Sequence, residues 1–491
     1  MGKLLNKYRN VPKTVKASFW FLVCSFVQKG ITTLTTPIFT RLLSTSEYGD
    51  FGVYQTWYNI IIILASLNLA SGVYMRGLVK YEEDRDRFSG SLQLLYILVT
   101  FLVFGIYLLF QKPLDILFGL PSEYIYVMFV DILLATAFHF FSTRQRVDYD
   151  YRLLLVVTVI NALLRPSLGI IAIKLFPEHR LSARIYSMII ADLITYGPIF
   201  ISFFTKGIHV FSVKYWKYAL AFNIPLVPHY LSQIVLNQSD RIMIKKMIGS
   251  DEAGIYSLAY GLASLMTILN SSIINTLTPW LYKQMKKENY KEIGINSTLI
   301  MVLVASANFF LVVFAPEIIA IMAPGTYYEA IWVIPPVSVG TFFIFMYSVF
   351  SRFEFYFEKT RFMMLASVFG AVLNVVLNYI FIPKYGYYAA GYTTLFCYLC
   401  YTLGHFTIMS IIMKKKKPGV KIFDIKLLSM IVLIFVGLCM LTMAVYTMPI
   451  LRIIIFLAVL FVFYLKKDVF LNMYREIESA KKVKNKTSEI E

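Results

Sequence analysis

The chain has 491 residues, of which 58% are hydrophobic and only 15% are charged, and its mean hydropathy is +0.67. Soluble domains have about 25% charged residues, so this composition excludes a soluble protein and indicates an integral membrane protein. The net charge of +19 would suit a nucleic-acid-binding protein, but the basic residues are scattered between apolar runs, and we expect no nucleic-acid partner.

Apolar stretches of about 20 residues, the length that crosses a bilayer as a helix, occur about fourteen times. The first six are expected near residues 17–40, 50–74, 91–111, 123–142, 152–176 and 182–204. The next six are expected near 218–240, 254–280, 296–322, 329–351, 361–383 and 387–412, and two more near 427–447 and 450–466. The connections are too short for a soluble domain, so we predict an all-α integral membrane protein.

The positions of Lys and Arg predict the orientation. With the N-terminus placed inside, about 35 of the 47 Lys and Arg residues fall on the inner side, and both termini are therefore expected in the cytoplasm. The inner basic loops, such as 414–417, are expected to hold the topology and to contact anionic lipid. Basic residues on the outer side could attract an anionic substrate: Lys174, Arg180 and Arg184, and Arg241, Lys245 and Lys246.

Four charged residues lie near the middle of predicted spans: Lys29, Asp131, Arg165 and Asp192. A charge at the bilayer centre costs roughly 2.5–3.5 kcal/mol on insertion scales, so such residues face a protein interior or a water-filled path. The sequence therefore predicts a polar cavity at mid-membrane and a transporter.

Polar residues also recur at helical spacing, which places them on single helix faces. The five faces are Ser25, Gln28, Lys29, Thr32 and Thr36; Thr158, Asn161 and Arg165; Asp192, Thr195 and Tyr196; His229, Ser232, Gln233, Asn237 and Asp240; and Asn374 and Asn378. Pro166, Pro225 and Pro228 are expected to interrupt their helices. Five such faces favour a wet interior, although an isolated Asn, Ser or Thr can simply make an interhelical hydrogen bond worth about 0.6 kcal/mol.

Signals for chemistry are few. No nucleotide-binding loop and no His, Asp or Glu cluster with metal-ligand spacing is present in the sequence, so we expect no cofactor, no metal and no enzyme activity. Cys397 and Cys400 have the spacing of a redox motif, but they lie in an apolar span and are interpreted as small core residues.

An internal repeat organises the chain. Segment 41–49 resembles segment 246–254: Glu47 matches Glu252 and Gly49 matches Gly254 at one constant offset. Both segments join the first and second helix of a six-helix set, which predicts two lobes, 1–210 and 211–415, related by a parallel repeat. The alternative is a coincidence between two helix-capping sequences. Residues 416–467 would add two extra helices, and 468–491 a basic cytoplasmic tail.

Three groups of motifs carry a resemblance to a known family. The first is Phe26–Ile31 with Pro37–Ser44 and Glu47–Gly49; the second is Ser239–Ile244 with Gly254–Tyr260; the third is Leu373–Asn378 with Ile382–Gly386 and Ala389–Gly391. In order and spacing, these motifs resemble the bacterial polysaccharide-export flippases of the Wzx type. The resemblance covers roughly residues 15–410.

This resemblance implies a two-lobed bundle of the multidrug/oligosaccharidyl-lipid/polysaccharide exporter superfamily in the bacterial cytoplasmic membrane. It also implies flipping of a polyprenyl-pyrophosphate-linked oligosaccharide for a surface polysaccharide such as a capsule or O-antigen, with membrane lipids, a polysaccharide polymerase and glycosyltransferases as partners. The motif positions singled out are Glu47, Gly49, Asp240, Arg241, Tyr256, Tyr260, Asn374 and Asn378.

A pyrophosphate would explain cations in the cavity, because a multiply charged anion crossing low dielectric needs partners. The residues expected to bind it or the glycan are Lys29, Arg165, Gln28, Asn161, Arg41, Gln233 and Asn237. Asp131, Asp192 and His229 are the expected coupling residues, for protons or another cation. A salt bridge from Lys29 or Arg165 to Asp131 or Asp192 and a helix-packing role for His229 remain alternatives.

Three other functions stay open. A lipid II flippase or a multidrug/cation antiporter would use the same fold, although an antiporter should have an acidic cavity. A membrane-bound polysaccharide polymerase would need a large extramembrane loop or a carboxylate-rich aqueous site, and neither is evident in the sequence.

Overall fold

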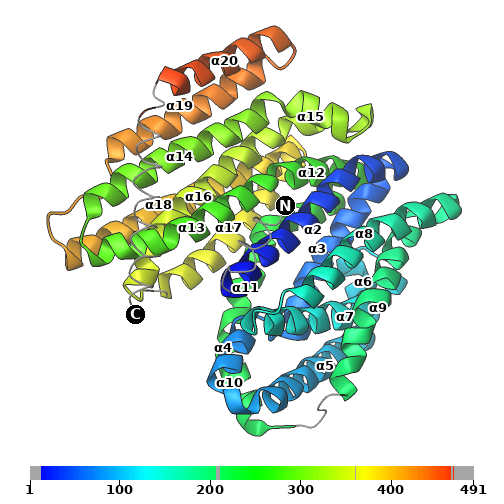
Figure 1. The fold of residues 1–491 in the computed structure, drawn as a ribbon. Coiled ribbons are helices and arrows are strands. Elements are labelled where there is room, and N and C mark those ends of the chain that lie inside the picture. Colours follow the sequence, from blue (N-terminus) through cyan, green and yellow to red (C-terminus); the bar gives the residue numbers. More distant parts are fainter. Residues whose placement is uncertain (1–12, 206–210, 360, 466–467, 469–491) are drawn as a thin grey trace, which may run out of the picture. The chain divides into compact units, whose positions relative to one another are not determined.

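Helix is the secondary structure of every element in the computed structural model, which describes residues 13–205, 211–359, 361–465 and 468. A chain surrounded by lipid must satisfy its backbone polar groups internally, and a helix does so within one segment. This confirms the predicted all-α class. The chain divides into two compact units, Met1–Gly254 and Ile255–Glu491, which are coloured by sequence in Figure 1. The predicted tail 468–491 lies almost wholly outside the described residues.

The first unit contains ten helices and the start of an eleventh within the described residues. They are α2 Lys13–Leu42, α3 Thr45–Ser66, α4 Gly72–Lys80, α5 Arg85–Leu109, α6 Gln111–Phe118, α7 Ser122–Val147, α8 Arg152–Leu175, α9 Arg180–Thr205, α10 Val213–Asn223, α11 Val227–Met247 and the beginning of α12 Ser250–Ala263. Short 3₁₀ turns lie at Glu82–Asp84, Pro177–His179 and Ile224–Leu226. Because α10 packs on α4 and α5, and α11 packs on α3, this unit extends beyond residue 210, and the lobe boundary there stays a prediction.

The second unit contains the remaining helices. They are α13 Leu265–Lys286, α14 Tyr290–Val313, α15 Ala315–Met322, α16 Ile334–Tyr356, α17 Arg361–Tyr385, α18 Tyr388–Lys416, α19 Ile425–Ala444 and α20 Pro449–Leu465, with a 3₁₀ segment at Gly325–Trp332. Its core is the tight packing of α16 against α18, with α14 and α13 on α16 and α17 on α18.

Each predicted span coincides with one helix or with consecutive helices. Among the described residues, 11 helices are long and apolar enough to cross a membrane, and Pro449–Val462 is a shorter apolar helix. Helices α2 and α3 have 30 and 22 residues but fall outside that set, because their polar residues lower their hydropathy. The chain is therefore a multi-pass membrane protein.

Proline has two different effects on these helices. Pro225 lies in a 3₁₀ turn, Ile224–Leu226, that separates α10 from α11, and Pro228 lies in the first turn of α11, so the predicted interruption is confirmed. The predicted break at Pro166 is wrong, because α8 runs without interruption from Arg152 to Leu175. A transmembrane helix tolerates an internal proline where neighbouring groups satisfy the freed carbonyl.

The repeated glycines meet in space. A methyl group on Gly49 of α3 would lie 1.9 Å from the carbonyl oxygen of Ser250, and one on Gly254 of α12 would lie 2.1 Å from that of Thr45. The two helix starts therefore approach each other through the positions that match in the predicted repeat. Ser44 also caps α3 in a capping box with Glu47, so the motif is both a cap and a contact.

The two helices beyond the predicted repeat are fastened to α14. Figure 1 shows α19 and α20 lying beside α14. Arg452 of α20 forms two bonds to the Glu317 carboxylate, at 2.6 and 2.9 Å, and a third to the Val313 carbonyl at 2.8 Å. The Arg452 hydrogen bonds hold the pKa of the Glu317 carboxyl below its usual value. Arg452 is thus a structural cation that anchors the C-terminal helices.

Candidate functional site

Three helices of the first unit bring together three of the four predicted mid-membrane charges. Helix α9 packs along both α7 and α8. Asp131 comes from α7, Arg165 from α8 and Asp192 from α9. We call these three residues, with Asn161 of α8, the Arg165 cluster. The polar faces predicted on separate spans therefore meet in the interior of one unit.

Arg165 is held by a two-point ion pair. Its Nε and Nη2 atoms lie 2.8 and 2.5 Å from the two carboxylate oxygens of Asp192, and Nη2 lies 3.5 Å from Asp131 Oδ1. Asn161 donates to Asp192 Oδ1 at 2.7 Å and to Thr195 Oγ1 at 2.8 Å. Arg165 therefore forms a salt bridge with Asp192 and Asp131, which was one of the two alternatives that the sequence left open. A fork-shaped pair of this kind fixes the guanidinium in one orientation.

Burial is unequal within the Arg165 cluster. The side chain of Asp192 is 0% exposed and that of Asp131 is 2% exposed, whereas that of Arg165 is 31% exposed. The acids are therefore sealed in the protein while the cation keeps an open face. An exposed guanidinium with free N–H groups can contact an anion without breaking its bonds to the acids.

A second arginine lies beside the cluster. Arg184 of α9 donates to the backbone carbonyl of Arg165 at 3.3 Å, and its guanidinium lies 3.8 Å from the centre of the Phe39 ring. The sequence analysis counted Arg184 among outer basic residues. The sequence did contain a sign that Arg184 belongs to the site. Arg184 and Asp192 are about two helical turns apart, and this spacing places both residues on one side of α9. With Arg184 included, the site has two cations and two carboxylates.

Aromatic residues surround this charge. Tyr54 and Tyr58 of α3 and Tyr196 of α9 lie close enough to interact electrostatically with Asp131, Arg165 and Asp192. Tyr54 is buried, and its ring meets that of Tyr124 of α7 edge-on at 6.5 Å. The sequence analysis did not single out Tyr54 or Tyr58, although their spacing of four residues places them on one face of α3.

The structure does not join Lys29 to the acids. Lys29 is exposed on α2, and Gln28 beside it is half-buried. No contact between Lys29 and Asp131 or Asp192 is seen among the described residues. Arg41, at the end of the same helix, donates to the Pro37 carbonyl at 2.8 Å. Lys29 is thus a cation of α2 outside the Arg165 cluster.

Helix α11 carries the longest predicted polar stripe. Asn237 donates to the Gln233 carbonyl at 2.6 Å, Asp240 is fully buried, and His229 and Arg241 are half-buried. The neighbouring Gln238, which the sequence analysis did not single out, accepts a hydrogen bond from Asn59 of α3 at 2.8 Å. Beyond the stripe, Lys245 pairs with Asp50 at 2.8 Å. The last turn of α11 and the start of α3 are therefore linked by an ion pair.

The predicted motif residues of the second unit lie in packed interiors. Asn374 donates to Thr394 at 3.0 Å, Asn378 donates to Asn374 at 3.2 Å, and Thr393 donates to Asn378. Both asparagines are fully buried, and this network fastens α17 to α18. Tyr256 and Tyr260 are buried on α12 with ring centres 5.8 Å apart.

The second unit also contains a buried pair that the sequence analysis missed. Glu354 of α16 and His405 of α18 lie 2.5 Å apart, with side-chain exposures of 0% and 2%. The Tyr347 ring stacks on the imidazole at 5.4 Å. The predicted span ended at residue 351, whereas α16 continues to Tyr356 and includes Glu354. We call these two residues the Glu354 pair.

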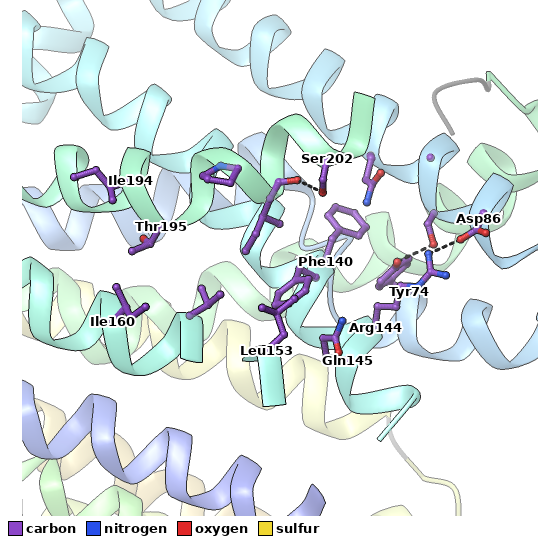
Figure 2. A pocket seen from close by; sticks show the side chains of 17 residues that line it. Tyr74, Asp86, Phe140, Arg144, Gln145, Leu153, Ile160, Ile194, Thr195 and Ser202 are labelled. Atoms are coloured by element: carbon purple, nitrogen blue, oxygen red, sulfur yellow. Dashed lines mark hydrogen bonds and ion pairs between the residues drawn. The ribbon is translucent and has the colours of Figure 1, made fainter. Parts of the chain in front are cut away.

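A cavity of about 860 Å³ begins beside the Arg165 cluster. Figure 2 shows Thr195 and Ile194 at one end of it and Tyr74, Asp86 and Arg144 at the other. Thr195 accepts the hydrogen bond from Asn161 described above. The cavity therefore reaches the network that holds Asp192.

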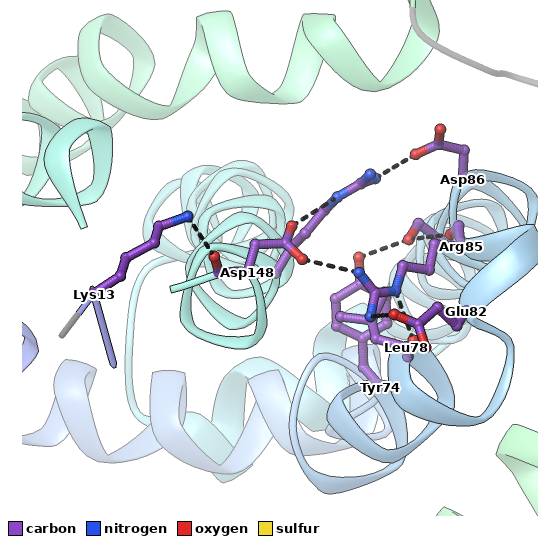
Figure 3. Close-up of polar contacts among 9 residues, drawn as sticks. Lys13, Tyr74, Leu78, Glu82, Arg85, Asp86 and Asp148 are labelled. Carbon is purple, nitrogen blue, oxygen red and sulfur yellow. Dashed lines mark hydrogen bonds and ion pairs between the residues drawn. The ribbon is translucent and has the colours of Figure 1, made fainter. Parts of the chain in front are cut away.

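Ion pairs lie at and near the far end of this cavity. Arg144 pairs with Asp86 at 2.6 Å, and Arg85 bonds to Glu82 and Asp148, each at 3.1 Å (Figure 3). Lys13 of α2 donates to the Asp148 carbonyl at 3.2 Å. These contacts tie the start of α5 to the end of α7. No group of three or more His, Cys, Asp or Glu side chains that could hold a metal ion is present in the described parts of the chain.

Comparison with known proteins identifies the family. The sequence profile of a family described as "Polysaccharide biosynthesis protein" matches residues 14–285. The chain belongs to this family. The match spans the whole Arg165 cluster. A second profile, "MatE", matches residues 225–380.

Relatives and solved structures agree with membership of the polysaccharide biosynthesis protein family. Protein 1 of the Lsg locus of Haemophilus influenzae is 22% identical over 386 residues, covering 74% of this chain and 90% of the relative. An uncharacterized membrane protein of the same organism is 21% identical over 287 residues, covering 56% of this chain and 67% of the relative.

Two solved structures share the fold. The lipid II flippase MurJ in an inward closed conformation has a TM-score of 0.67 at 14% identity, covering 93% of this chain and 100% of MurJ. An inward-facing multidrug resistance transporter of the MATE family has a TM-score of 0.64 at 15% identity, covering 80% of this chain and 96% of the transporter. This member of the polysaccharide biosynthesis protein family therefore has the fold of these two membrane proteins.

Proposed function

We propose that this protein moves a polyprenyl-pyrophosphate-linked oligosaccharide from the inner to the outer leaflet of the bacterial cytoplasmic membrane. The observation that carries the proposal is the Arg165 guanidinium, oriented by two buried acids and still 31% exposed. A guanidinium fork matches the oxygens of a phosphate group. The family match over residues 14–285 supports a substrate used in polysaccharide biosynthesis.

Protons offer a means of controlling this site. With Asp131 and Asp192 ionised, their charge balances Arg165 and the neighbouring Arg184. In this proposal a proton on Asp131 leaves one positive charge uncompensated, so affinity for an anion rises when that proton binds. The cavity that ends at Thr195 supports proton access to this network. Asp131 and Asp192 are accordingly the proposed coupling residues, in a cycle of alternating access between the lobes 1–210 and 211–415.

The other predicted residues have subsidiary roles in this proposal. Exposed Lys29 supplies a mobile cation for the pyrophosphate, with Gln28 and Arg41 on the same helix, and Gln233 and Asn237 of α11 contact the glycan. His229 stays a proposed proton carrier. The outer-leaflet product is consumed by a polysaccharide polymerase, and glycosyltransferases supply the inner-leaflet substrate. Both termini are placed in the cytoplasm by the distribution of basic residues.

The test is flipping in reconstituted vesicles. A fluorescent polyprenyl-pyrophosphate oligosaccharide is placed in both leaflets, and a membrane-impermeant quencher reports how fast the protected molecules reach the outside. The wild-type protein should accelerate this exchange over protein-free vesicles, and an imposed pH or sodium gradient should change the rate. No acceleration by correctly folded protein would contradict the proposal.

Two substrate controls separate the alternatives. Lipid II replaces the oligosaccharide lipid in one set of vesicles, and a cationic dye is loaded in another. Faster movement of lipid II than of the oligosaccharide lipid would favour a lipid II flippase. Dye efflux coupled to cation entry, without lipid movement, would favour a multidrug antiporter.

A further inference from the structure

A second cavity, of about 1090 Å³, lies in the unit Ile255–Glu491 between the start of α14, the end of α18 and the segment that leads into α19. Four exposed lysines line it: Lys291, Lys414, Lys421 and Lys426. One acid, Asp424, also lines it, but its Oδ1 caps α19 by accepting from the backbone N–H groups of Lys426 and Leu427 at 2.9 and 3.4 Å. The rim of the cavity is therefore strongly cationic.

These lysines are not used in ion pairs. Within the ranges that the structure describes, none of the four ammonium groups pairs with a carboxylate. The neighbouring Lys417 differs, because it pairs with Glu288 at 2.5 Å and does not line the cavity. Like charges gathered without counter-charges indicate a site for an anion.

Many of the other residues that line this cavity are apolar. They comprise Ile295, Leu299, Phe406, Met409, Met413, Val420, Ile425 and Leu427. Ile295 and Ile425 are 52% and 59% exposed, although both are large aliphatic residues. A cavity lined by both lysines and exposed apolar side chains matches the two parts of a phospholipid, a charged phosphate and apolar acyl chains.

The shape of the cavity is fixed by close packing. A methyl group on Gly294 of α14 would lie 1.9 Å from the Ile422 carbonyl oxygen, so only glycine lets the segment approach this helix. Next to Ile422, Phe423 packs edge-on against Phe350 at 5.2 Å. Gly419 has φ of +84° and permits the turn that returns the chain from α18. The cavity is thus preformed rather than a gap between loose side chains.

We propose that this cavity binds an anionic glycerophospholipid, with its phosphate among the four lysines and its acyl chains over Ile295 and Ile425. The distribution of basic residues predicts this end of α18 at the inner surface, where anionic lipids are available. Its volume, about 1090 Å³, reaches the upper end of the range for small-molecule sites. The ligand class differs from the flipped substrate, and the proposal does not depend on transport.

Native mass spectrometry of the purified full-length chain tests this proposal. The protein is mixed with phosphatidylglycerol or with phosphatidylcholine of the same acyl chains, and retained lipid is counted. The wild type should retain phosphatidylglycerol at least about tenfold more tightly than phosphatidylcholine, since several lysines act on one phosphate. The variant Lys414→Gln/Lys421→Gln/Lys426→Gln should lose that preference.

A matched variant controls for net charge. Lys283→Gln/Lys286→Gln/Lys287→Gln removes three exposed lysines that do not line the cavity, and it should keep the preference. Equal loss in both variants, or no preference in the wild type, would overturn the proposal. If the first variant does not fold, Lys421→Glu in the exposed segment is tested instead. An unchanged preference of Lys421→Glu for phosphatidylglycerol would also overturn the proposal.

Competition identifies the ligand's source. Glycerol phosphate, which has no acyl chains, should not displace the bound lipid at equal concentration; displacement would show a simple anion site. A polyprenyl pyrophosphate that displaces phosphatidylglycerol at lower concentration would show a substrate site and contradict the proposal. Because no transport is measured, failure here would leave the flipping result unaffected.

Discussion

The two units each bury a pair of ionisable side chains, and the difference in exposure between the two pairs shows which one can bind a ligand. In the Arg165 cluster the acids are sealed and the cation is 31% exposed. In the Glu354 pair both partners are sealed, at 0% and 2% exposure, and Tyr347 covers the imidazole. A charge with an open face can change partners, whereas a fully enclosed pair contributes only to packing. The comparison therefore assigns substrate binding to the Arg165 cluster and a structural role to the Glu354 pair.

The largest expected effect follows removal of the exposed cation. Arg165→Gln should reduce flipping by about 100-fold or more, because it removes the guanidinium fork and leaves two buried acids unpaired. Breaking a buried pair costs about 3–5 kcal/mol, so membrane abundance must be measured with the transport rate. Arg165→Lys should keep part of the activity.

A double variant separates binding from folding. Arg165→Gln/Asp192→Asn removes one of the two buried charges that the single variant leaves, so abundance should recover in part while flipping stays absent. Recovery of flipping as well would show that Arg165 only stabilises the fold, and the two regions would then be alike.

Lys29 tests whether an exposed cation outside the cluster also serves the substrate. Lys29→Ala should lower flipping about tenfold with little change in thermal stability, because the side chain is exposed and breaks no described ion pair. Lys29→Arg should retain most activity. The control is Lys112→Ala, which removes an exposed lysine of α6; an equal loss there would point to net charge rather than position.

Asp131→Asn sharpens the comparison by imitating a bound proton. The substitution leaves one positive charge uncompensated, so affinity for a pyrophosphate should rise about tenfold at neutral pH, a change of roughly 1.4 kcal/mol. The rise in wild-type affinity as pH falls should also flatten. Equilibrium binding at several pH values measures the affinity and its pH dependence. Asp251→Asn, which neutralises an exposed acid, is the control. A weaker affinity in Asp131→Asn would contradict the assigned coupling.

The Glu354 pair should give the smallest effect on binding. Glu354→Gln should leave pyrophosphate affinity and its pH dependence unchanged and cost about 1.5–3 kcal/mol of stability, the usual contribution of a hydrogen bond to a charged group. Thermal unfolding and binding measured on the same preparation check this. A changed pH dependence would show that the sealed pair also takes part in coupling.

The sequence predicted the helices well because apolar length is a strong signal, and Pro225 with Pro228 marked the break between α10 and α11. It also predicted the residues of the Arg165 cluster, since a charge within an apolar span is conspicuous. It could not tell an ion pair from separate cavity charges, because pairing joins helices far apart in sequence. Periodicity carries no information on which faces of different helices meet.

The same limit explains what was missed. Glu354 lies just beyond a predicted span and His405 stands alone in another, so nothing in the sequence linked them. Arg184 was counted with the outer basic residues because it lies at the start of the predicted span 182–204, whereas α9 begins at Arg180 and places Arg184 in its second turn. The α8 helix passes Pro166 because packing overrides the local preference of proline.

The most direct test of the central claim is binding of a polyprenyl pyrophosphate to the purified protein from mildly basic to mildly acidic pH. The uncharged polyprenol of the same length controls for lipid partitioning. The account predicts that the pyrophosphate binds more tightly as pH falls, that polyprenol binding does not change, and that Arg165→Gln/Asp192→Asn abolishes the difference. Equal affinity for both lipids, or a pyrophosphate affinity that Arg165 does not affect, would contradict the assignment of the Arg165 cluster as the substrate site.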